Sequence, residues 1–258
     1  MSSKNNHFLE ELLKHVVCIG GVYKQRDNGK LKGYAYSAFV MSRNENVFLV
    51  TAGHCLASLK DAIEHQQIEI VSCNLIDYVH PQAVHKLSLP FRLSEHEYAM
   101  MDKDGIDIGI VKLNQLEQQS LIANKIQPFS VNSLSFSQED EFCFIGIIGF
   151  PDEYIKLTNG NVQFLPTLSP VVKVDFEDVA KKYKFPIMSC KLIDNQQPQS
   201  LEGVSGGPVF AFKEQEGKFI YEIIGIQSEW LRESRIAIIT PFQTVIEFIK
   251  ENRDVESK

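Results

Sequence analysis

The sequence lacks a long hydrophobic segment: none of its apolar runs approaches the about 18 residues that a membrane-spanning helix requires. It also lacks a cluster of lysine and arginine, and its formal net charge is −7. Binding to nucleic acid or to an anionic membrane takes clustered basic side chains that neutralise phosphates. We therefore expect neither a nucleic-acid partner nor a membrane partner.

Cysteine is scarce and shows no pattern. The five cysteines are Cys18, Cys55, Cys73, Cys143 and Cys190, an odd number without any Cys-x-x-Cys spacing. Zinc sites usually use such spacing, so we predict no metal and no cofactor. The start of the chain is charged and helical in pattern rather than an apolar secretory signal. This predicts a cytoplasmic protein.

What the sequence does contain is a succession of short strand patterns. With 44% hydrophobic residues in 258, the chain can bury a large core in one large domain or two small ones. The pattern predicts strands near residues 16–19, 33–41, 47–52, 68–72, 108–113, 142–149, 171–174, 187–190, 209–212, 220–227 and 236–239. Helical patterns occupy residues 7–15, 55–65 and 240–250, and the polar segment 114–126 is expected to be a connector. We predict an all-β protein with short terminal helices.

One segment combines a serine with glycines, namely Glu202-Gly203-Val204-Ser205-Gly206-Gly207-Pro208. Serine is a poor nucleophile at neutral pH, so it needs a neighbouring base and a place where an oxyanion is held. Glycine allows the tight backbone turn that such a place requires. The alternative interpretation is a surface turn, because Gly, Ser and Pro are common turn residues. The strand patterns directly behind Ser205 favour a nucleophile.

The chain offers a base and a carboxylate in matching contexts. Thr51-Ala52-Gly53-His54-Cys55 ends an apolar run, which would deliver His54 at the end of a buried strand. Asp107 opens the strand pattern 108–113, whereas the rival carboxylates Asp102 and Asp104 lie in a turn-rich segment and are expected to be solvated. A carboxylate that accepts the imidazole N–H orients the base and stabilises its protonated form. We predict that His54, Asp107 and Ser205 act together.

In the order His, Asp, Ser, these three segments resemble the chymotrypsin-like (trypsin-like) serine peptidases. Gly149-Phe150-Pro151 looks like a turn of the bacterial-type members. The resemblance implies a single peptidase domain (1–258) built of two antiparallel six-stranded β-barrels, at 16–115 and 125–240, and a C-terminal helix at 241–252. The site would lie in the cleft between the barrels. The implied function is hydrolysis of protein or peptide substrates by a serine endopeptidase through an acyl-enzyme, with the backbone N–H groups of Gly203 and Ser205 as oxyanion donors.

The sequence departs from the secreted members of that family at two positions. Val204 stands where digestive members carry an aspartate that pairs with the new N-terminus after zymogen cleavage, so we expect no activation of that kind. Ile19-Gly20-Gly21 is similar to an activation sequence, but we expect it to form a strand and turn. In many secreted members the cysteine beside the histidine is bonded to one in the preceding strand, but the corresponding strand here, Tyr34–Val40, has none. Cys55 is therefore expected to be a free thiol, which fits a reducing compartment.

The resemblance also points to four substrate-binding residues: Gln199, Ser228, Glu229 and Trp230. Gln199 precedes the serine by six positions and is neutral, so cleavage after Lys or Arg is not supported by it. Ser228, Glu229 and Trp230 would pair with a bound peptide and wall its pocket. Glu229 could instead supply negative charge for a basic side chain, and Trp230 could be ordinary packing.

Two other functions compete with the peptidase. The chain could be a binding or scaffold module on a peptidase fold, active only with a regulatory protein partner, because fold alone does not fix function. The second competing function is cysteine chemistry through Cys55, which adjoins His54. Neighbouring residues of a strand point to opposite faces, so we expect this thiol to point away from His54 into the core.

Overall fold

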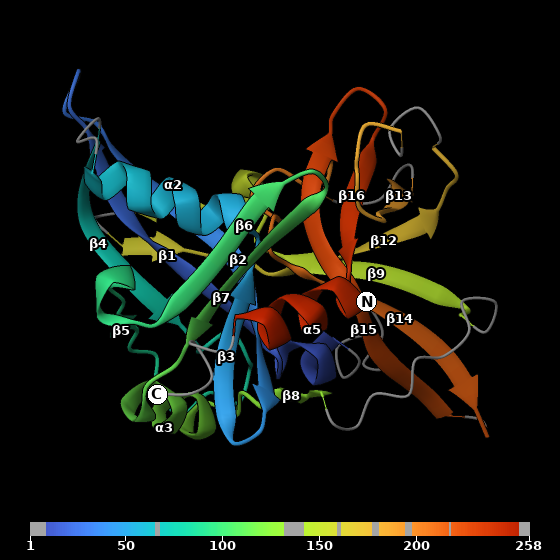
Figure 1. The fold of residues 1–258 in the computed structure, drawn as a ribbon. Helices are drawn as coiled ribbons and strands as arrows, with labels where there is room; N and C mark the ends of the chain where they lie inside the picture. Colours follow the sequence, from blue (N-terminus) through green and yellow to red (C-terminus); the bar gives the residue numbers. More distant parts are fainter. Residues whose placement is uncertain are drawn as a thin grey trace.

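The computed structural model describes residues 9–64, 68–131, 142–158, 161–176, 181–193, 198–216 and 218–252 (Figure 1). The first two residues of the predicted N-terminal helix and the predicted polar tail after residue 252 lie outside these ranges. The described chain is mostly antiparallel β-structure in two sheets, as Figure 1 shows on its left and right sides. The predicted all-β class is confirmed, and the fold is of the chymotrypsin-like, double-barrel class.

The first half of the chain forms an eight-stranded sheet with the order β5-β4-β1-β2-β3-β7-β6, and β8 pairs with β2. Its strands are β1 (Val16–Gln25), β2 (Leu31–Arg43), β3 (Asn46–Thr51), β4 (Ile68–Ile76), β5 (Leu89–Pro90), β6 (Tyr98–Lys103), β7 (Ile106–Lys112) and β8 (Phe129–Ser130). Sequence patterns predicted five of these strands, and the resemblance implied six, all antiparallel. Strands β5, β6 and β8 were not predicted, and β8 joins in parallel. Its two residues are too few to show a period.

The second half contains the predicted six-stranded barrel, which is closed in the order β12-β13-β16-β15-β14-β9. Its strands are β9 (Phe144–Gly149), β12 (Thr167–Lys173), β13 (Met188–Leu192), β14 (Pro208–Gln215), β15 (Lys218–Leu231) and β16 (Ile236–Pro241). A separate hairpin of β10 (Lys156–Thr158) and β11 (Asn161–Gln163) follows the short 3₁₀ helix η4 (Asp152–Tyr154). Buried aliphatic side chains from five of the barrel strands, such as Ile147, Val209 and Ile239, form one cluster.

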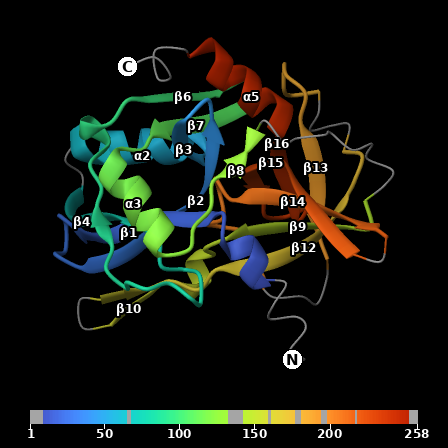
Figure 2. The ribbon, with the colours of Figure 1, turned by 90° about the horizontal axis from the view of Figure 1, so that it is seen from below.

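One hydrophobic core joins the two halves. It contains Phe39 and Val50 from the first sheet, Phe210 from the barrel, and Phe242 from the C-terminal helix α5 (Phe242–Glu251). As predicted, α5 is amphipathic and follows Pro241, and it contacts β7, β15 and β16 (Figure 2). Because the same buried cluster draws on both sheets, the two halves are held in a fixed relation on either side of the site.

Three further helical segments belong to the first half, at residues 9–13, at α2 (Gly53–Glu64) and at η1 (Leu93–Glu95). The segment expected to be a connector is also helical, as α3 (Gln115–Ala123). Its start is stabilised by a capping box: the side chain of Asn114 accepts from Glu117 N, and the side chain of Glu117 accepts from Asn114 N. The spacing of these two residues is the signal that the sequence prediction missed.

Candidate active site

His54 lies where strand β3 gives way to helix α2. The helix begins at Gly53, where a Cβ would collide with the main-chain carbonyls of Met101 and Ile108. His54 Nδ1 lies 2.7 Å from Asp107 Oδ2, and His54 N donates to Asp107 Oδ1 over 2.9 Å. The carboxylate therefore holds both the backbone and the ring of His54, and Nε2 is the ring nitrogen that Asp107 does not contact.

The electrostatics of this pair follow from its burial. Asp107 is 8% exposed, while the side chain of His54 is 38% exposed. Burial lowers the pKa of His54, but the hydrogen bond to Asp107, together with the contact with Cys55, outweighs burial and raises that pKa well above its usual 6.5. The proton at His54 is thus held more tightly than on an ordinary imidazole.

The loop that carries Ser205 depends on two glycines with positive φ, Gly203 (82°) and Gly206 (88°). A Cβ at Gly203 would collide with the carboxylate of Asp152, and one at Gly206 would collide with Thr51 and Ser37 of the first sheet. Other residues rarely adopt this left-handed backbone. The glycines therefore let the loop fold tightly against both halves of the molecule.

Two backbone N–H groups of the loop that carries Ser205 have no acceptor among the described residues. Within the described ranges, neither Gly203 N nor Ser205 N donates a hydrogen bond to another described residue. The peptide before Gly203 is oriented from its other side, because Glu202 O accepts from Asp152 N over 2.9 Å. Two free N–H groups beside a hydroxyl are what an oxyanion requires.

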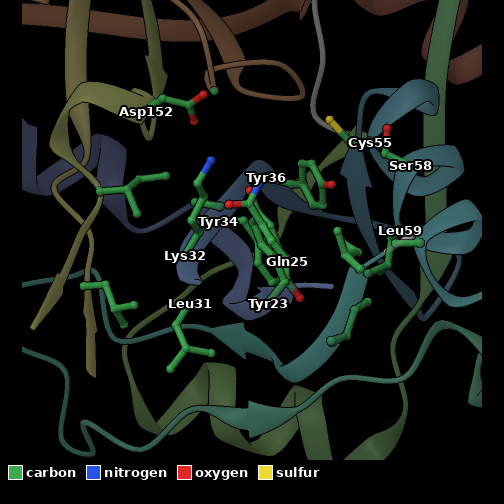
Figure 3. A pocket seen from close by; sticks show the side chains of 18 of the residues that line it. Tyr23, Gln25, Leu31, Lys32, Tyr34, Tyr36, Cys55, Ser58, Leu59 and Asp152 are labelled. Carbon is green, nitrogen blue, oxygen red and sulfur yellow. The ribbon is translucent and has the colours of Figure 1, made fainter. Parts of the chain in front are cut away.

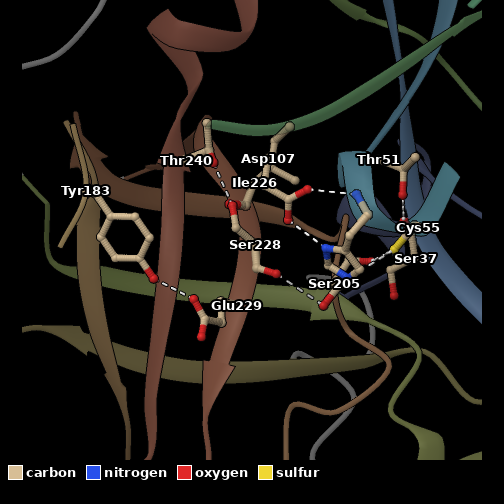
Figure 4. Close-up of polar contacts among 11 residues, drawn as sticks. Ser37, Thr51, Cys55, Asp107, Tyr183, Ser205, Ile226, Ser228, Glu229 and Thr240 are labelled. Atoms are coloured by element: carbon tan, nitrogen blue, oxygen red, sulfur yellow. Dashed lines mark hydrogen bonds and ion pairs between the residues drawn. The ribbon is translucent and has the colours of Figure 1, made fainter. Parts of the chain in front are cut away.

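Ser205 and His54 line the same two cavities, but they are not hydrogen-bonded to each other among the interactions described for residues 9–252. Ser205 Oγ donates to Ser228 O over 3.4 Å, as Figure 4 shows. His54 Nε2 instead lies 3.6 Å from Cys55 Sγ. The structure thus brings His54 and Asp107 into contact and Ser205 to the same cavity, with the Ser205 hydroxyl turned toward β15.

The predicted direction of the Cys55 thiol is wrong. The side chain is buried, at 1% exposed, but Sγ lies 3.6 Å from both His54 Nε2 and Ser205 O. The prediction assumed a strand, in which neighbours point to opposite faces, whereas Cys55 belongs to the first turn of α2. The thiol remains free, as do the other four cysteines.

The two rival carboxylates lie close to this pair but outside it. Asp104 lies in the turn between β6 and β7, as expected, with φ of 59°. Asp102 lies in strand β6, directly opposite Asp107, and is exposed. Partial burial and the negative charge of Asp107 raise the pKa of Asp102. The described contacts of His54 involve Asp107, not these two residues.

Three of the four predicted substrate-binding residues line one cavity of 490 Å³ together with Ser205 and His54: Ser228, Glu229 and Trp230. Ser228 Oγ is bonded to Thr240 Oγ1 (2.6 Å), and Tyr183 donates to Glu229 Oε2 (2.5 Å). Trp230 also packs against the barrel core, so its contacts are compatible with both predicted roles, as a wall of the cavity and as ordinary packing. Tyr183 was not predicted, since a lone tyrosine in a lysine-rich loop gives no signal.

Gln199 lies apart from the other three. Its backbone N donates to Glu153 Oε1 over 3.1 Å, and its carbonyl accepts from Arg235 Nη1 over 3.3 Å. It is absent from the lining of both cavities that contain Ser205. Counting six positions back from a serine assumes a loop of standard length. In this chain the contacts of Gln199 with Glu153 and Arg235 hold it outside both cavities.

The described residues include no group of three or more His, Cys, Asp or Glu side chains placed to hold a metal ion. Among the helices described for this chain, none is both long and apolar enough to cross a membrane.

Comparison with known proteins gives structural neighbours only. No protein-family model and no curated protein sequence matches the chain. Two solved proteases, of which AL20 is described as a serine protease, are similar in structure. Anisep from Arthrobacter nicotinovorans has 15% identity and a TM-score of 0.47, over 90% of this chain and 93% of its own. The thermostable AL20 from an extremophilic microorganism has 13% identity and a TM-score of 0.49, over 93% and 98%. The fold is therefore defined by the strand topology, and the candidate site by the contacts within this chain.

Proposed function

We propose that this protein is a serine endopeptidase that hydrolyses peptide bonds of protein substrates, with Ser205 as nucleophile, His54 as base and Asp107 as its orienting carboxylate. The observation that carries the proposal is the double contact between His54 and Asp107 at the edge of the cavity that also contains Ser205. The fold supports it only in general terms, because such folds host several functions.

In the proposed reaction, Ser205 Oγ turns from Ser228 O toward His54 Nε2 and attacks the carbonyl carbon of the substrate. His54 takes the hydroxyl proton, and Asp107 stabilises the imidazolium. The oxyanion accepts hydrogen bonds from the N–H groups of Gly203 and Ser205. The carbon–nitrogen bond then breaks as His54 gives the proton to the leaving amine, and water hydrolyses the acyl-enzyme by the same steps.

The decisive experiment is labelling with a fluorophosphonate probe, which reacts with an activated serine. We expect the wild-type protein to be labelled and Ser205→Ala to lose the label. Ser234→Ala, in the turn between β15 and β16, is the control and should label like wild type. Equal labelling of wild type and Ser205→Ala would overturn the assignment.

We further propose that the enzyme does not need zymogen cleavage. Val204 is fully buried, and Ile19 is a fully buried residue of β1 rather than a free end. Releasing Ile19 as a new N-terminus would break the pairing of β1 with β2 and β4. Full-length protein should therefore react with the probe as purified; reactivity that begins only after cutting before Ile19 would contradict this.

The second candidate is a binding module that becomes active only with a regulatory protein partner. One observation favours it: Ser205 Oγ and His54 Nε2 are each engaged elsewhere, with Ser228 O and Cys55 Sγ. Labelling of the isolated protein distinguishes the two candidates, because a partner-dependent protein stays unlabelled alone while a competent peptidase does not.

We propose a cytoplasmic location on the basis of cysteine chemistry. All five cysteines are free thiols, and Cys143 is exposed. Free exposed thiols persist in a reducing compartment. Imaging of the tagged protein in its native cell, or its fractionation, tests this directly.

A further inference from the structure

The largest cavity beside Ser205 is lined mostly by tyrosine and aliphatic side chains, together with Lys30, Lys32, Gln25 and Ser58. It has a volume of 920 Å³ and begins at His54, Gly203 and Ser205. Figure 3 shows Tyr23, Tyr34 and Tyr36 grouped inside it, with Leu59 on one side and Lys32 on the other. Within the described lining, Asp152 is the one carboxylate, at the mouth beside Gly203. This composition suits an apolar ligand group.

Strand β2 lines the cavity along its length and leads away from Ser205. Ser37 of β2 is bonded to Gly203 O in the loop of Ser205, over 3.0 Å. Tyr36 is the neighbour of Ser37 in β2, and Tyr34 and Lys32 follow at alternate positions. Side chains two apart in a strand share one face at a spacing of about 7 Å. Tyr36 thus lies near the site, Tyr34 one step further and Lys32 beyond it. An extended peptide has the same repeat.

The aromatic wall is held in place before any ligand binds. The rings of Tyr34 and Tyr36 have centroids 5.6 Å apart, and those of Tyr23 and Tyr34 are 6.2 Å apart. Tyr34 Oη donates to Ser72 O over 3.2 Å. Its cross-strand neighbour is Gly21, where a Cβ would collide with Ser72 O. A fixed wall loses little conformational entropy when a ligand binds.

The facing walls of the cavity are aliphatic. Leu59 of α2, Ile70 of β4 and Leu157 of the β10–β11 hairpin contribute them. The hairpin lies directly on β2, because a Cβ at Gly33 would contact Val162 at 2.9 Å. Leu59 is 2% exposed, whereas Ile70 and Leu157 are partly exposed and can gain contacts from a ligand. Apolar side chains placed between these walls would leave water.

We propose that this cavity binds the residue on the amine side of the cleaved bond and selects a large aliphatic or aromatic side chain there. The inference rests on the proposed peptidase function. We assign the acyl side of the substrate in that function to the other cavity, which Ser228 and Glu229 line together with Ser205. A peptide that passes Ser205 must then continue into the cavity of Tyr34 and Tyr36.

Acyl transfer tests the amine side by itself. Ser205 is first acylated from a small activated ester, such as p-nitrophenyl acetate, which leaves the amine side empty. An added amino-acid amide then attacks the acyl carbonyl with its amine. The bond to Ser205 Oγ breaks, the amine proton returns through His54, and an N-acyl amino-acid amide is released. The ratio of this product to free acid measures binding in the cavity, and it does not depend on the rate of acylation.

We expect phenylalanine amide and leucine amide to be captured at least about tenfold better than glycine amide, and lysine amide no better than glycine amide. Ile70→Ala should reduce the ratio for phenylalanine amide several-fold. The matched control is Val71→Ala, since Val71 is the next residue of β4, is 55% exposed and does not line this cavity. Leu157→Ala, on the hairpin, repeats the test if Ile70→Ala does not fold.

The outcomes separate the two levels of the hypothesis. A protein that transfers its acyl group equally to glycine and phenylalanine amides overturns the inference while the peptidase assignment stands. A preference for lysine amide overturns it as well. A protein that is never acylated overturns the peptidase function and the inference together.

Discussion

Ser37 and Gly203, which are far apart in the sequence, are joined by a partly buried hydrogen bond: Ser37 Oγ donates to Gly203 O over 3.0 Å. The same hydroxyl accepts from Phe150 N over 2.9 Å, and Ser37 is fully buried. One side chain of the first sheet thus ties down both the loop of Ser205 and the end of β9. The position of the nucleophile depends on the packing of the two halves, not on its own loop alone.

Ser37→Ala should weaken both stability and reactivity. Removing the hydroxyl leaves the buried N–H of Phe150 without its acceptor and the partly buried carbonyl of Gly203 without this donor. We expect a cost of about 1–3 kcal/mol in the free energy of unfolding. We expect a lower urea midpoint and slower labelling of Ser205 by a fluorophosphonate. Ser42→Ala, further along β2, is the control. An unchanged midpoint together with an unchanged labelling rate would show that the bond has no such role.

Asp107→Asn should change both the rate and the titration of His54. We expect kcat to fall by about 10⁴-fold. Because Asp107 raises the pKa of His54, the neutral base accumulates only as pH rises through that raised value, so the wild-type rate should increase with pH above 6.5. In Asp107→Asn the imidazole should titrate at lower pH, as measured by NMR.

Asp102→Asn and Asp104→Asn are the controls for that experiment, because both carboxylates lie near His54 without a described bond to it. Each should retain most of the activity. If one of them abolished activity while Asp107→Asn did not, the carboxylate of the triad would have been assigned to the wrong residue.

Gly203→Ala should abolish the oxyanion site. Its φ of 82° is unfavourable for alanine, and the new methyl group would collide with Asp152. We expect labelling of Ser205 to slow by about 10²–10³-fold. The matched control is Gly29→Ala, which has a similar φ of 69° and where a Cβ would make only an ordinary contact with Lys24. It imposes the same backbone strain without the collision, and it should leave labelling unchanged.

His96→Gln should destabilise the protein in a pH-dependent manner. His96 Nε2 lies 2.8 Å from Glu117 Oε1, and both side chains are 4% exposed. Burial lowers the pKa of His96, but the bond to Glu117 outweighs burial and raises it. A raised pKa gives stability that is complete below pH 6.5 and is lost as pH rises through the folded value. Urea unfolding should show a loss of about 3 kcal/mol at pH 6 and less at pH 9.

An exposed ion pair provides the comparison for His96→Gln. Arg92 and Glu95 are bonded over 2.8 Å, but their side chains are 72% and 60% exposed. Glu95→Gln should therefore leave the urea midpoint almost unchanged at either pH. An equal loss for His96→Gln at pH 6 and pH 9 would contradict the proposed titration.

Much of this molecule could be predicted from local sequence patterns. Strand β3 and helix α5 follow from hydrophobic periodicity, because a buried strand or an amphipathic face needs apolar residues at fixed intervals. The proposed nucleophile, base and carboxylate could also be chosen, since Ser205, His54 and Asp107 each end or begin a strand pattern. Strands as short as β5 and β8, and the hairpin β10–β11, contain too few residues to show a period.

Only the tertiary structure decided how these groups meet. The Ser205 hydroxyl points toward Ser228, which is distant in the sequence, and the direction of the Cys55 thiol is set by the first turn of α2. Gln199 lies apart because its backbone is hydrogen-bonded to Glu153 and Arg235. The cavity of Tyr34 and Tyr36 likewise forms where β1, β2, β4, α2 and the hairpin come together. A sequence pattern encodes the period of one element, whereas contacts between elements depend on packing that no single segment contains.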